Sequence, residues 1–430
     1  MSRVASVIAV LVWVTGSGEF VRAQEKGSDG FYHFAGKHLE LVTDLPPDAE
    51  LERLPEVFDL AVPIWCETFG VAEDAVTDWK ATAYVMLDRG RFKTAGVIPN
   101  QVPEFPYGYQ YGNLLFVSEQ PSAYYRRHLV LHEGTHWFMS RYFKGNAAPW
   151  IMEGMAELLG THTWDPDAAH LSLNVLPQNK RDFPYWGRIT RIHEDIDGGV
   201  APSLDSILQY DNTAHRRVEA YAWSWAAVLF MTQHPRTREA FQEMLAQTHR
   251  PDGSQSRWLV RRLGKDWSRV REEWNSFITD LDYGYRTASG MLSISPQPKV
   301  LRDRAVISVG VNQSWQASGV VLRSGMKVRI TASDDLFVVR PGARPWMSSA
   351  GGITLEYFNG RPTGQLVMQQ VAPRPPKAVG ATEKLEVLTV GQELIWTAEE
   401  NGELHFRINE SSADLVDNVG ELELEIALIR

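Results

Sequence analysis

Cysteine is nearly absent from this sequence: Cys66 is the only one among 430 residues. No disulfide can therefore form within the chain. Cys66 stands between Trp65 and Glu67, in an apolar pattern with helical spacing. We expect it to be a small buried residue.

Long apolar runs are also missing, since no stretch reaches the roughly twenty residues that a membrane helix needs. The longest early run, Val4–Val14, follows Arg3 and precedes the small residue Ala23. This order is typical of a secretory signal peptide, which we place at residues 1–23, with a membrane anchor as the alternative. We expect a secreted or periplasmic protein with no stable membrane span after cleavage.

Basic residues are fewer than acidic ones, 43 against 53, and the formal charge is −10. Loss of Arg3, Glu19 and Arg22 with the signal peptide changes this charge to −11. Such acidity argues against nucleic acid or an anionic membrane as partner. The remaining length of about 400 residues is enough for two or three domains with real cores.

The most informative stretch begins with His132-Glu133-Gly134-Thr135-His136, which fits H-E-x-x-H. Residues i and i+4 share one face of a helix, so His132 and His136 can offer two imidazole nitrogens to one metal ion. Glu133 can act as general base toward a water on that ion. The motif is short and does occur by chance, and paired histidines can simply be hydrogen-bonded. However, the apolar flanks predict a buried helix, where His and Glu need partners.

A catalytic zinc ion needs a third protein ligand, for which we select Glu153. It lies in a second predicted helix, with sixteen residues (137–152) between it and His136. Glu157, one turn later, can orient a ligating histidine without contacting the metal. His128, one turn before His132, is interpreted as a structural residue, with support of the site as the alternative. His162 is equally ambiguous.

The stretch from His132 to Glu157 includes the segment W-I-M-E-G-M-A at 150–156. It resembles the gluzincin metallopeptidases, in their M1-type and peptidase MA-like branches. The resemblance spans roughly residues 28–285 and is specific over 128–160 and 217–232. It implies that His132, His136 and Glu153 bind zinc, that Glu133 is the catalytic base and that Glu157 supports a ligand.

Tyr221 lies in a predicted helix at 217–232, at a distance from His136 similar to that of the catalytic tyrosine of M1 relatives. The resemblance implies that its hydroxyl stabilises the oxyanion, although Ser224 replaces the usual glycine. The alternative is a tyrosine packed in the core. The G-x-M-E-N segment, by which M1 aminopeptidases hold an amino terminus, is missing, which favours an endopeptidase.

The periodicity predicts a multidomain protein, with an α+β gluzincin-like catalytic domain followed by an antiparallel β-sandwich. The catalytic domain would comprise an α+β part at 24–125 and a helical zinc-binding part at 126–286. Asn113–Val117 is the candidate substrate-binding edge strand, and 161–200 is expected to be irregular. A linker at 287–298 would lead to the sandwich at 299–430. Further strands, helices and sandwich runs are predicted at 31–42, 48–69, 80–88, 111–118, 238–247, 266–281, 305–309, 326–332, 365–371, 385–390, 394–397, 404–408 and 422–428.

The sandwich sequence resembles the calcium-dependent galactose lectins at both of its ends, 315–330 and 402–420. The resemblance implies a calcium site at Glu410, Asp417 and Asn418, because hard oxygen ligands on a turn suit Ca²⁺. Glu410 and Asp417 depart from the residue types of the lectins. The alternative is a rigid accessory domain that kept only the fold.

Together these features predict an exported zinc metallopeptidase that acts inside peptide or protein chains, with or without glycans, and they make carbohydrate a candidate partner of the sandwich. The alternative is a non-catalytic glycan-binding or adhesion protein with a structural metal site.

Overall fold

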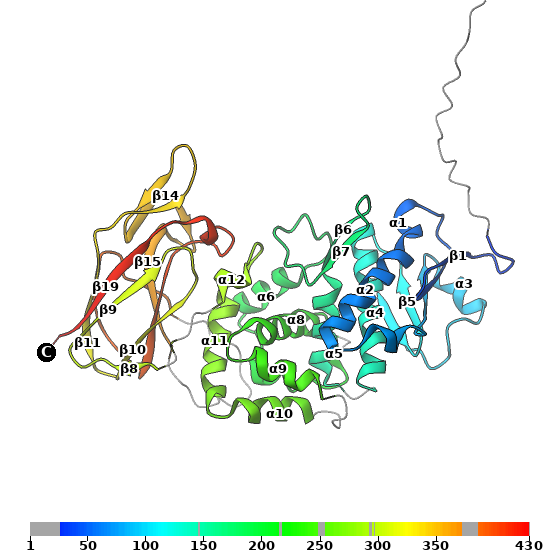
Figure 1. The fold of residues 1–430 in the computed structure, drawn as a ribbon, viewed down its shortest axis with the longest axis horizontal. Helices are drawn as coiled ribbons and strands as arrows, with labels where there is room; N and C mark the ends of the chain where they lie inside the picture. The colour runs from blue at the N-terminus through cyan, green and yellow to red at the C-terminus, as the bar shows by residue number, and fades with distance from the viewer. Residues whose placement is uncertain are drawn as a thin grey trace, which may run out of the picture.

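The computed structural model describes residues 26–144, 147–214, 217–247, 254–291, 295, 297–371 and 386–429. A mixed sheet is followed by a helical region and then by antiparallel strands (Figure 1). The expected multidomain α+β organisation is therefore confirmed. The proposed signal peptide, 1–23, lies outside the described residues.

The chain begins with a five-stranded sheet in the order β1-β2-β3-β5-β4. Its strands are β1 (Tyr32–Ala35), β2 (Leu39–Thr43), β3 (Ala81–Met86), β4 (Gly108–Tyr111) and β5 (Leu114–Ser118). The central strands β2, β3 and β5 are parallel, whereas β1 and β4 run antiparallel to their neighbours. The expectation that Asn113–Val117 forms the edge is wrong, because the chain turns back at Gly112 and β5 lies inside the sheet. Within the described residues, the edge strands are β1 and β4, and β4 is the one that pairs with β5.

The helix predicted at 48–69 is broken into α1 (Ala49–Glu52) and α2 (Leu54–Phe69). Asp48 caps α1 by accepting a hydrogen bond from the backbone N–H of Leu51, 2.7 Å away. Gly70 ends α2 in the left-handed conformation, at φ 66°, which glycine adopts without strain. Cys66 on α2 is buried as expected, and burial raises the pKa of its thiol.

Helices make up most of the next region, and they surround α8 (Val218–Gln233), which is buried along nearly its whole length. The predicted helices at 217–232, 238–247 and 266–281 are observed as α8, α9 and α11. The other elements of this part and of the preceding loops are η1 (Glu73–Val76), α3 (Arg89–Thr94), α4 (Ala123–Tyr142), α5 (Pro149–Gly160), α7 (Leu204–Ile207), α9 (Arg238–Leu245), α10 (Ser254–Leu263), η3 (Gly264–Asp266), α11 (Trp267–Asp280) and α12 (Thr287–Gly290).

The segment 161–200 is more regular than expected. It contains the hairpin β6 (His162–Asp165) and β7 (His170–Leu173) and the helix α6 (Arg188–Asp197). The strands are too short to show alternation. In α6 only Ile189, Ile192 and Asp195 are buried, so its apolar signal is weak.

The C-terminal part contains two main sheets with a common hydrophobic core. One has the order β14-β15-β18-β10-β8, with β16 on β15, and the other has the order β17-β11-β19-β9. Every pairing is antiparallel except that of β8 with β10. The elements are β8 (Lys299–Val300), β9 (Arg304–Gly310), β10 (Gln316–Leu322), β11 (Lys327–Ala332), β12 (Phe337–Arg340), β13 (Trp346–Ser348), β14 (Gly351–Phe358), β15 (Arg361–Val371), β16 (Leu388–Thr389), β17 (Glu393–Thr397), β18 (Gly402–Ile408), η4 (Leu415–Asp417) and β19 (Glu421–Leu428).

Two large hydrophobic clusters lie on either side of the proposed linker. One runs from Phe34 to Tyr285 and the other from Leu301 to Ile426. We therefore propose a division within 287–298, where α12 forms one helical turn. Buried polar groups join the two sides: the amide of Gln369 on β15 donates to the Ser276 hydroxyl on α11 at 2.7 Å.

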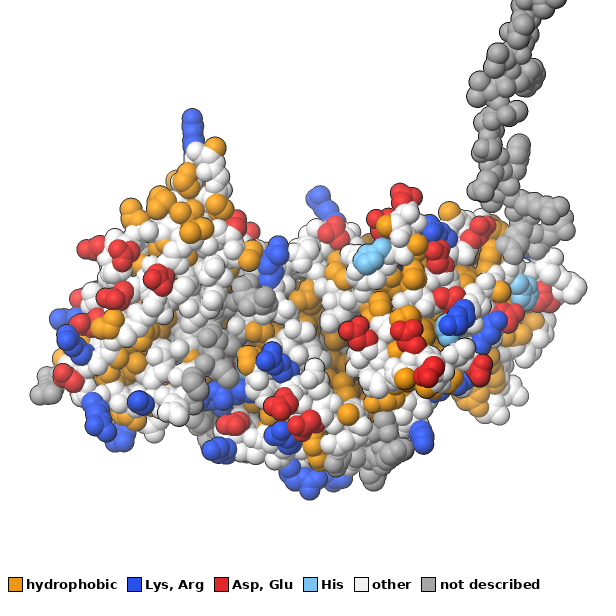
Figure 2. Space-filling view, viewed as in Figure 1, with side chains coloured by type: hydrophobic (Ala, Val, Ile, Leu, Met, Phe, Trp, Pro, Cys, Tyr) orange, Lys and Arg blue, Asp and Glu red, His pale blue; other side chains and the backbone are white. Residues whose placement is uncertain are grey.

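The surface carries both charge signs. On the face shown in Figure 2, acidic and basic side chains are interspersed, and hydrophobic side chains gather over the projecting β14 hairpin. Leu355 and Tyr357 of β14 are 82% and 59% exposed. Among the described residues, no helix has the length and apolarity to cross a membrane.

Candidate metal centre

The two histidines and Glu133 lie on α4, a helix whose position is fixed by close packing. The Ser122 hydroxyl caps its first turn by accepting from the Tyr125 N–H. Gly134, inside the H-E-x-x-H motif, faces α2, where an added Cβ would come within 2.6 Å of the Phe58 ring and 2.7 Å of the Trp65 ring. The small residue lets α2 approach, and the opposite side of α4 carries the polar groups.

Three predicted ligands converge from α4 and α5. The Nε2 atoms of His132 and His136 are 3.1 Å apart. Glu153 Oε2 on α5 lies 3.7 Å from the first and 3.4 Å from the second. The structure thus contains a His/Glu group whose ligand atoms all lie within 4.8 Å of one another, and that group could hold a metal ion.

The burial and protonation of these side chains are suited to binding a cation. Glu153 Oε2 is buried without a hydrogen-bond partner, so a cation would supply what it lacks. Burial lowers the pKa of His132 well below its usual value, which leaves a neutral ring with a lone pair for a metal. Burial would lower the pKa of His136, but the carboxylates of Glu153, Glu133 and Glu157 together outweigh it and raise this pKa. Two imidazoles and one carboxylate are a donor set that suits zinc.

Glu133 lies next to the edge strand of the sheet. A Cβ added to Gly108, the first residue of β4, would come within 2.3 Å of Glu133 Oε1. The backbone of β4 and this carboxylate are therefore in direct contact. Burial raises the pKa of Glu133 to about 8, against the attraction of His136. A carboxyl group with this pKa can both accept and return a proton near neutral pH.

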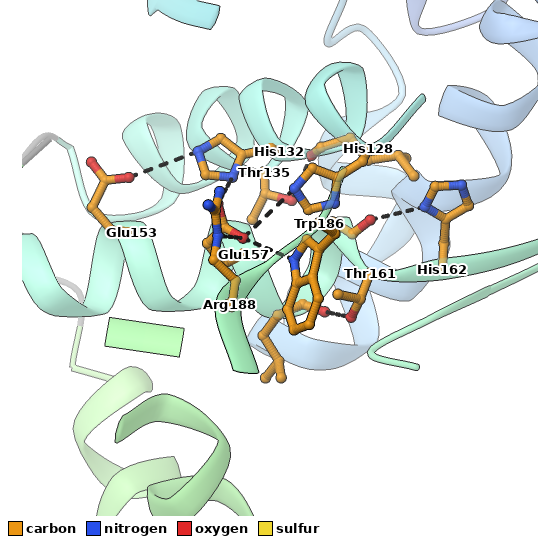
Figure 3. A network of polar contacts seen from close by, with 12 residues as sticks. His128, His132, Thr135, Glu153, Glu157, Thr161, His162, Trp186 and Arg188 are labelled. Atoms are coloured by element: carbon orange, nitrogen blue, oxygen red, sulfur yellow. Dashed lines mark hydrogen bonds and ion pairs between the residues drawn. The ribbon is translucent and has the colours of Figure 1, made fainter. Parts of the chain in front are cut away.

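Glu157 is 1% exposed and lies behind His132, as Figure 3 shows. Its Oε1 is 3.4 Å from His132 Nδ1, and its Oε2 is 3.6 Å from His128 Nε2. Arg188 donates to both oxygens, at 2.9 Å from Nε and 2.7 Å from Nη2. Burial alone would raise the pKa of Glu157, but Arg188 and His128 together hold it well below its usual value.

His128 and His162 both lie inside the protein. His128 is completely buried, and its Nε2 lies 3.6 Å from Glu157 Oε2. This position favours the alternative interpretation of His128, as a residue that supports the site. The His162 Nε2 atom accepts from Arg127 Nε at 3.0 Å, and its Nδ1 donates to the Gly160 carbonyl at 2.9 Å. His162 is therefore a satisfied core histidine.

Tyr221 comes from the first turn of α8 and lies beside the proposed ligands. Its ring centroid is 5.9 Å from that of His132, and the Arg188 guanidinium lies 5.4 Å from the ring. Burial and the carboxylates of Glu153 and Glu133 raise the pKa of its hydroxyl, which therefore stays a hydrogen-bond donor. The backbone of Ser224 packs against Gly154 of α5.

Sequence reasoning missed Arg188 and Trp186, whose indole N–H donates to Glu157 Oε2 at 3.2 Å. Both lie in the segment expected to be irregular. The preceding Tyr185 is 64% exposed and has a φ of 69°, an uncommon conformation for an aromatic residue. A positively charged residue near the start of an amphipathic helix carries no sequence signal for contact with a buried glutamate.

The proposed calcium residues do not surround one open position. Glu410 is buried, and it binds the Arg340 guanidinium and the Asn418 amide N–H, the latter at 2.7 Å. Asp417 on η4 is exposed. An arginine competes with a cation for the same carboxylate, and calcium binding at Glu410, Asp417 and Asn418 stays a prediction.

No protein-family model matches the chain, and no curated protein matches it. Weak structural neighbours were found among solved structures, and they include a lectin domain and a metallopeptidase. The EclA N-terminal domain, a PllA-like lectin, is 18% identical, covers 30% of this chain and 97% of its own, and has a TM-score of 0.21. The IMPa metallopeptidase in complex with T-antigen is 10% identical and has a TM-score of 0.17; the match covers 92% of this chain but 42% of that protein. At these TM-scores neither likeness carries an argument, so the proposals below rest on the residues.

Proposed function

We propose that the chain is a zinc-dependent metallopeptidase that cleaves inside peptide chains. The observation that carries this proposal is the approach of His132, His136 and Glu153 to one another, with Glu133 between them and the edge strand β4. An extended peptide can add to a free strand edge through main-chain hydrogen bonds, which would bring its backbone beside Glu133.

In this proposal His132, His136 and Glu153 hold zinc, which when bound polarises the scissile carbonyl and acidifies water. Glu133 takes a proton from the attacking water and returns it to the leaving amine. The Tyr221 hydroxyl donates a hydrogen bond to the oxyanion that develops on the carbonyl oxygen. Each group is assigned a role that its position and charge allow.

The test compares zinc content and peptide-library hydrolysis in wild type, Glu133→Gln and Glu153→Ala. Glu133→Gln should keep zinc and lose hydrolysis by at least about 100-fold, because only the base is removed. Glu153→Ala should lose both. Glu67→Gln, an exposed position on α2, serves as the matched control and should change neither.

An active Glu133→Gln enzyme would refute the proposed mechanism. Zinc without any hydrolysis in wild type would instead favour the glycan-binding alternative. In that case a glycan array, run with and without calcium, would test the sandwich and its predicted site at Glu410.

A further inference from the structure

Arg188 is a largely covered cation that binds Glu157 beside the proposed zinc ligands. Both of its hydrogen bonds to Glu157 are short, and its side chain is 12% exposed. Its guanidinium also contacts the ring of Tyr221. Arg188 thus touches two residues of the site and none of the three proposed ligands, and it comes from α6, outside the two motif helices.

Glu157 needs this partner. The carboxylate is 1% exposed, and an unpaired charge at such a position costs several kcal/mol, as is general for buried ions. His128 and His132 also lie close to Glu157, at 3.6 and 3.4 Å, but an imidazole ring carries no permanent charge. Arg188 is the one permanently charged group among the described contacts of Glu157.

His132 in turn depends on Glu157. Its Nδ1 atom has no hydrogen-bond partner within geometric limits among the described residues, and Glu157 Oε1 is the acidic atom next to it. The acceptor on one imidazole nitrogen determines which tautomer forms and how the ring is turned. A chain of contacts therefore runs from Arg188 through Glu157 to His132 (Figure 3). A second contact joins the Arg188 guanidinium to the Tyr221 ring, 5.4 Å from its centroid.

We propose that Arg188 is a positioning residue of the active site, which holds Glu157 against His132 Nδ1 and holds the Tyr221 ring beside His132. This inference rests on the proposed function. Through Glu157 it orients a zinc ligand, and through Tyr221 it orients the group that would bind the oxyanion. It has no direct contact with metal or substrate in this role.

The experiment uses the full mature chain and the variants Arg188→Met and Arg188→Lys. Zinc affinity is measured by competition with a chromophoric chelator, and the His132 tautomer in the zinc-free protein is measured by nitrogen NMR. Arg188→Met should weaken zinc binding by about 10- to 100-fold and redistribute the tautomer. It should lower kcat more than it raises KM. Arg188→Lys should recover only part of the zinc affinity and of kcat, because one ammonium group cannot make the contacts with both Glu157 and Tyr221.

Added guanidinium ion should restore zinc affinity and kcat in Arg188→Met, since it replaces the missing group. Arg257→Met is the matched control, because Arg257 is an exposed arginine on α10, away from the proposed ligands in the sequence. It should leave all readouts unchanged.

The outcomes separate the two proposals. A wild-type protein that binds no zinc and hydrolyses no peptide refutes the proposed function, and Arg188 loses its role with it. If wild type binds zinc and cleaves, but Arg188→Met keeps affinity and kcat within about threefold, only the Arg188 proposal fails. It also fails if Arg188→Met loses function through unfolding, without rescue by guanidinium.

Discussion

Single buried residues determine much of the chemistry of this protein, and His162 gives a measurable case. Burial and the Arg127 charge lower the pKa of this imidazole to about 3. The unfolded chain therefore takes up its proton first as the pH falls. The contribution of His162 to stability is fully present above pH 6.5 and is lost progressively toward pH 3.

We predict that His162→Gln is less sensitive to acid than wild type. Between pH 7 and pH 5, the variant should lose about 2 kcal/mol less free energy of unfolding than wild type does, because one proton-linked group is gone. Urea unfolding at both pH values measures this difference. His170→Gln, at an exposed histidine of β7, should behave as wild type. Equal acid sensitivity in His162→Gln would contradict the assignment.

At the scale of elements, the contact between α5 and α8 holds Glu153 in place. A Cβ added to Gly154 would come within 2.4 Å of both the Ser224 carbonyl and Val228 Cγ2. The helices can approach this closely because α5 contributes a glycine. The next residue back along α5 is Glu153.

We predict that Gly154→Ala destabilises the protein by about 1–3 kcal/mol, because the added methyl group forces the helices apart. It should also weaken zinc binding, since Glu153 moves with α5. Thermal unfolding and chelator competition measure the two effects. Gly310→Ala is the control, because the atom nearest to the added Cβ would be 3.5 Å away. Its stability and its zinc affinity should both stay near wild type. Unchanged stability in Gly154→Ala would show that α8 can shift at little cost.

At the scale of the whole molecule, the sandwich and the helical region share buried ion pairs. Arg407 on β18 binds Asp280 at the end of α11, and their side chains are 4% and 9% exposed. Arg269 on α11 binds Glu403 at 3.1 Å. Such contacts couple the two hydrophobic cores.

We predict that Arg407→Ala destabilises the protein by about 3–5 kcal/mol, because Asp280 keeps a buried and unpaired charge. Arg304→Ala removes an exposed pair with Glu425, at 70% and 49% exposure, and should cost at most about 1 kcal/mol. Denaturant unfolding of both variants provides the comparison. Similar small losses in the two variants would mean that the sandwich is only loosely attached.

The sequence by itself determined the local features of this protein. Spacing of four along α4 placed His132 and His136 on one face, and apolar periodicity located α8, α11 and the main sandwich strands. These are contacts and patterns within one element, so they can be read along the chain. The nature of the site, two imidazoles near a carboxylate from α5, followed from the same reading.

Only the tertiary structure decided which residues from distant parts of the chain lie beside the H-E-x-x-H motif of α4. It replaced β5 by β4 as the edge strand, because the choice depends on the turn at Gly112. It brought Arg188 to Glu157, and it paired Glu410 with Arg340. These contacts join residues far apart in the chain, and their free energy comes from desolvation and charge in the folded interior. No local pattern records them, so they could not be predicted from spacing alone.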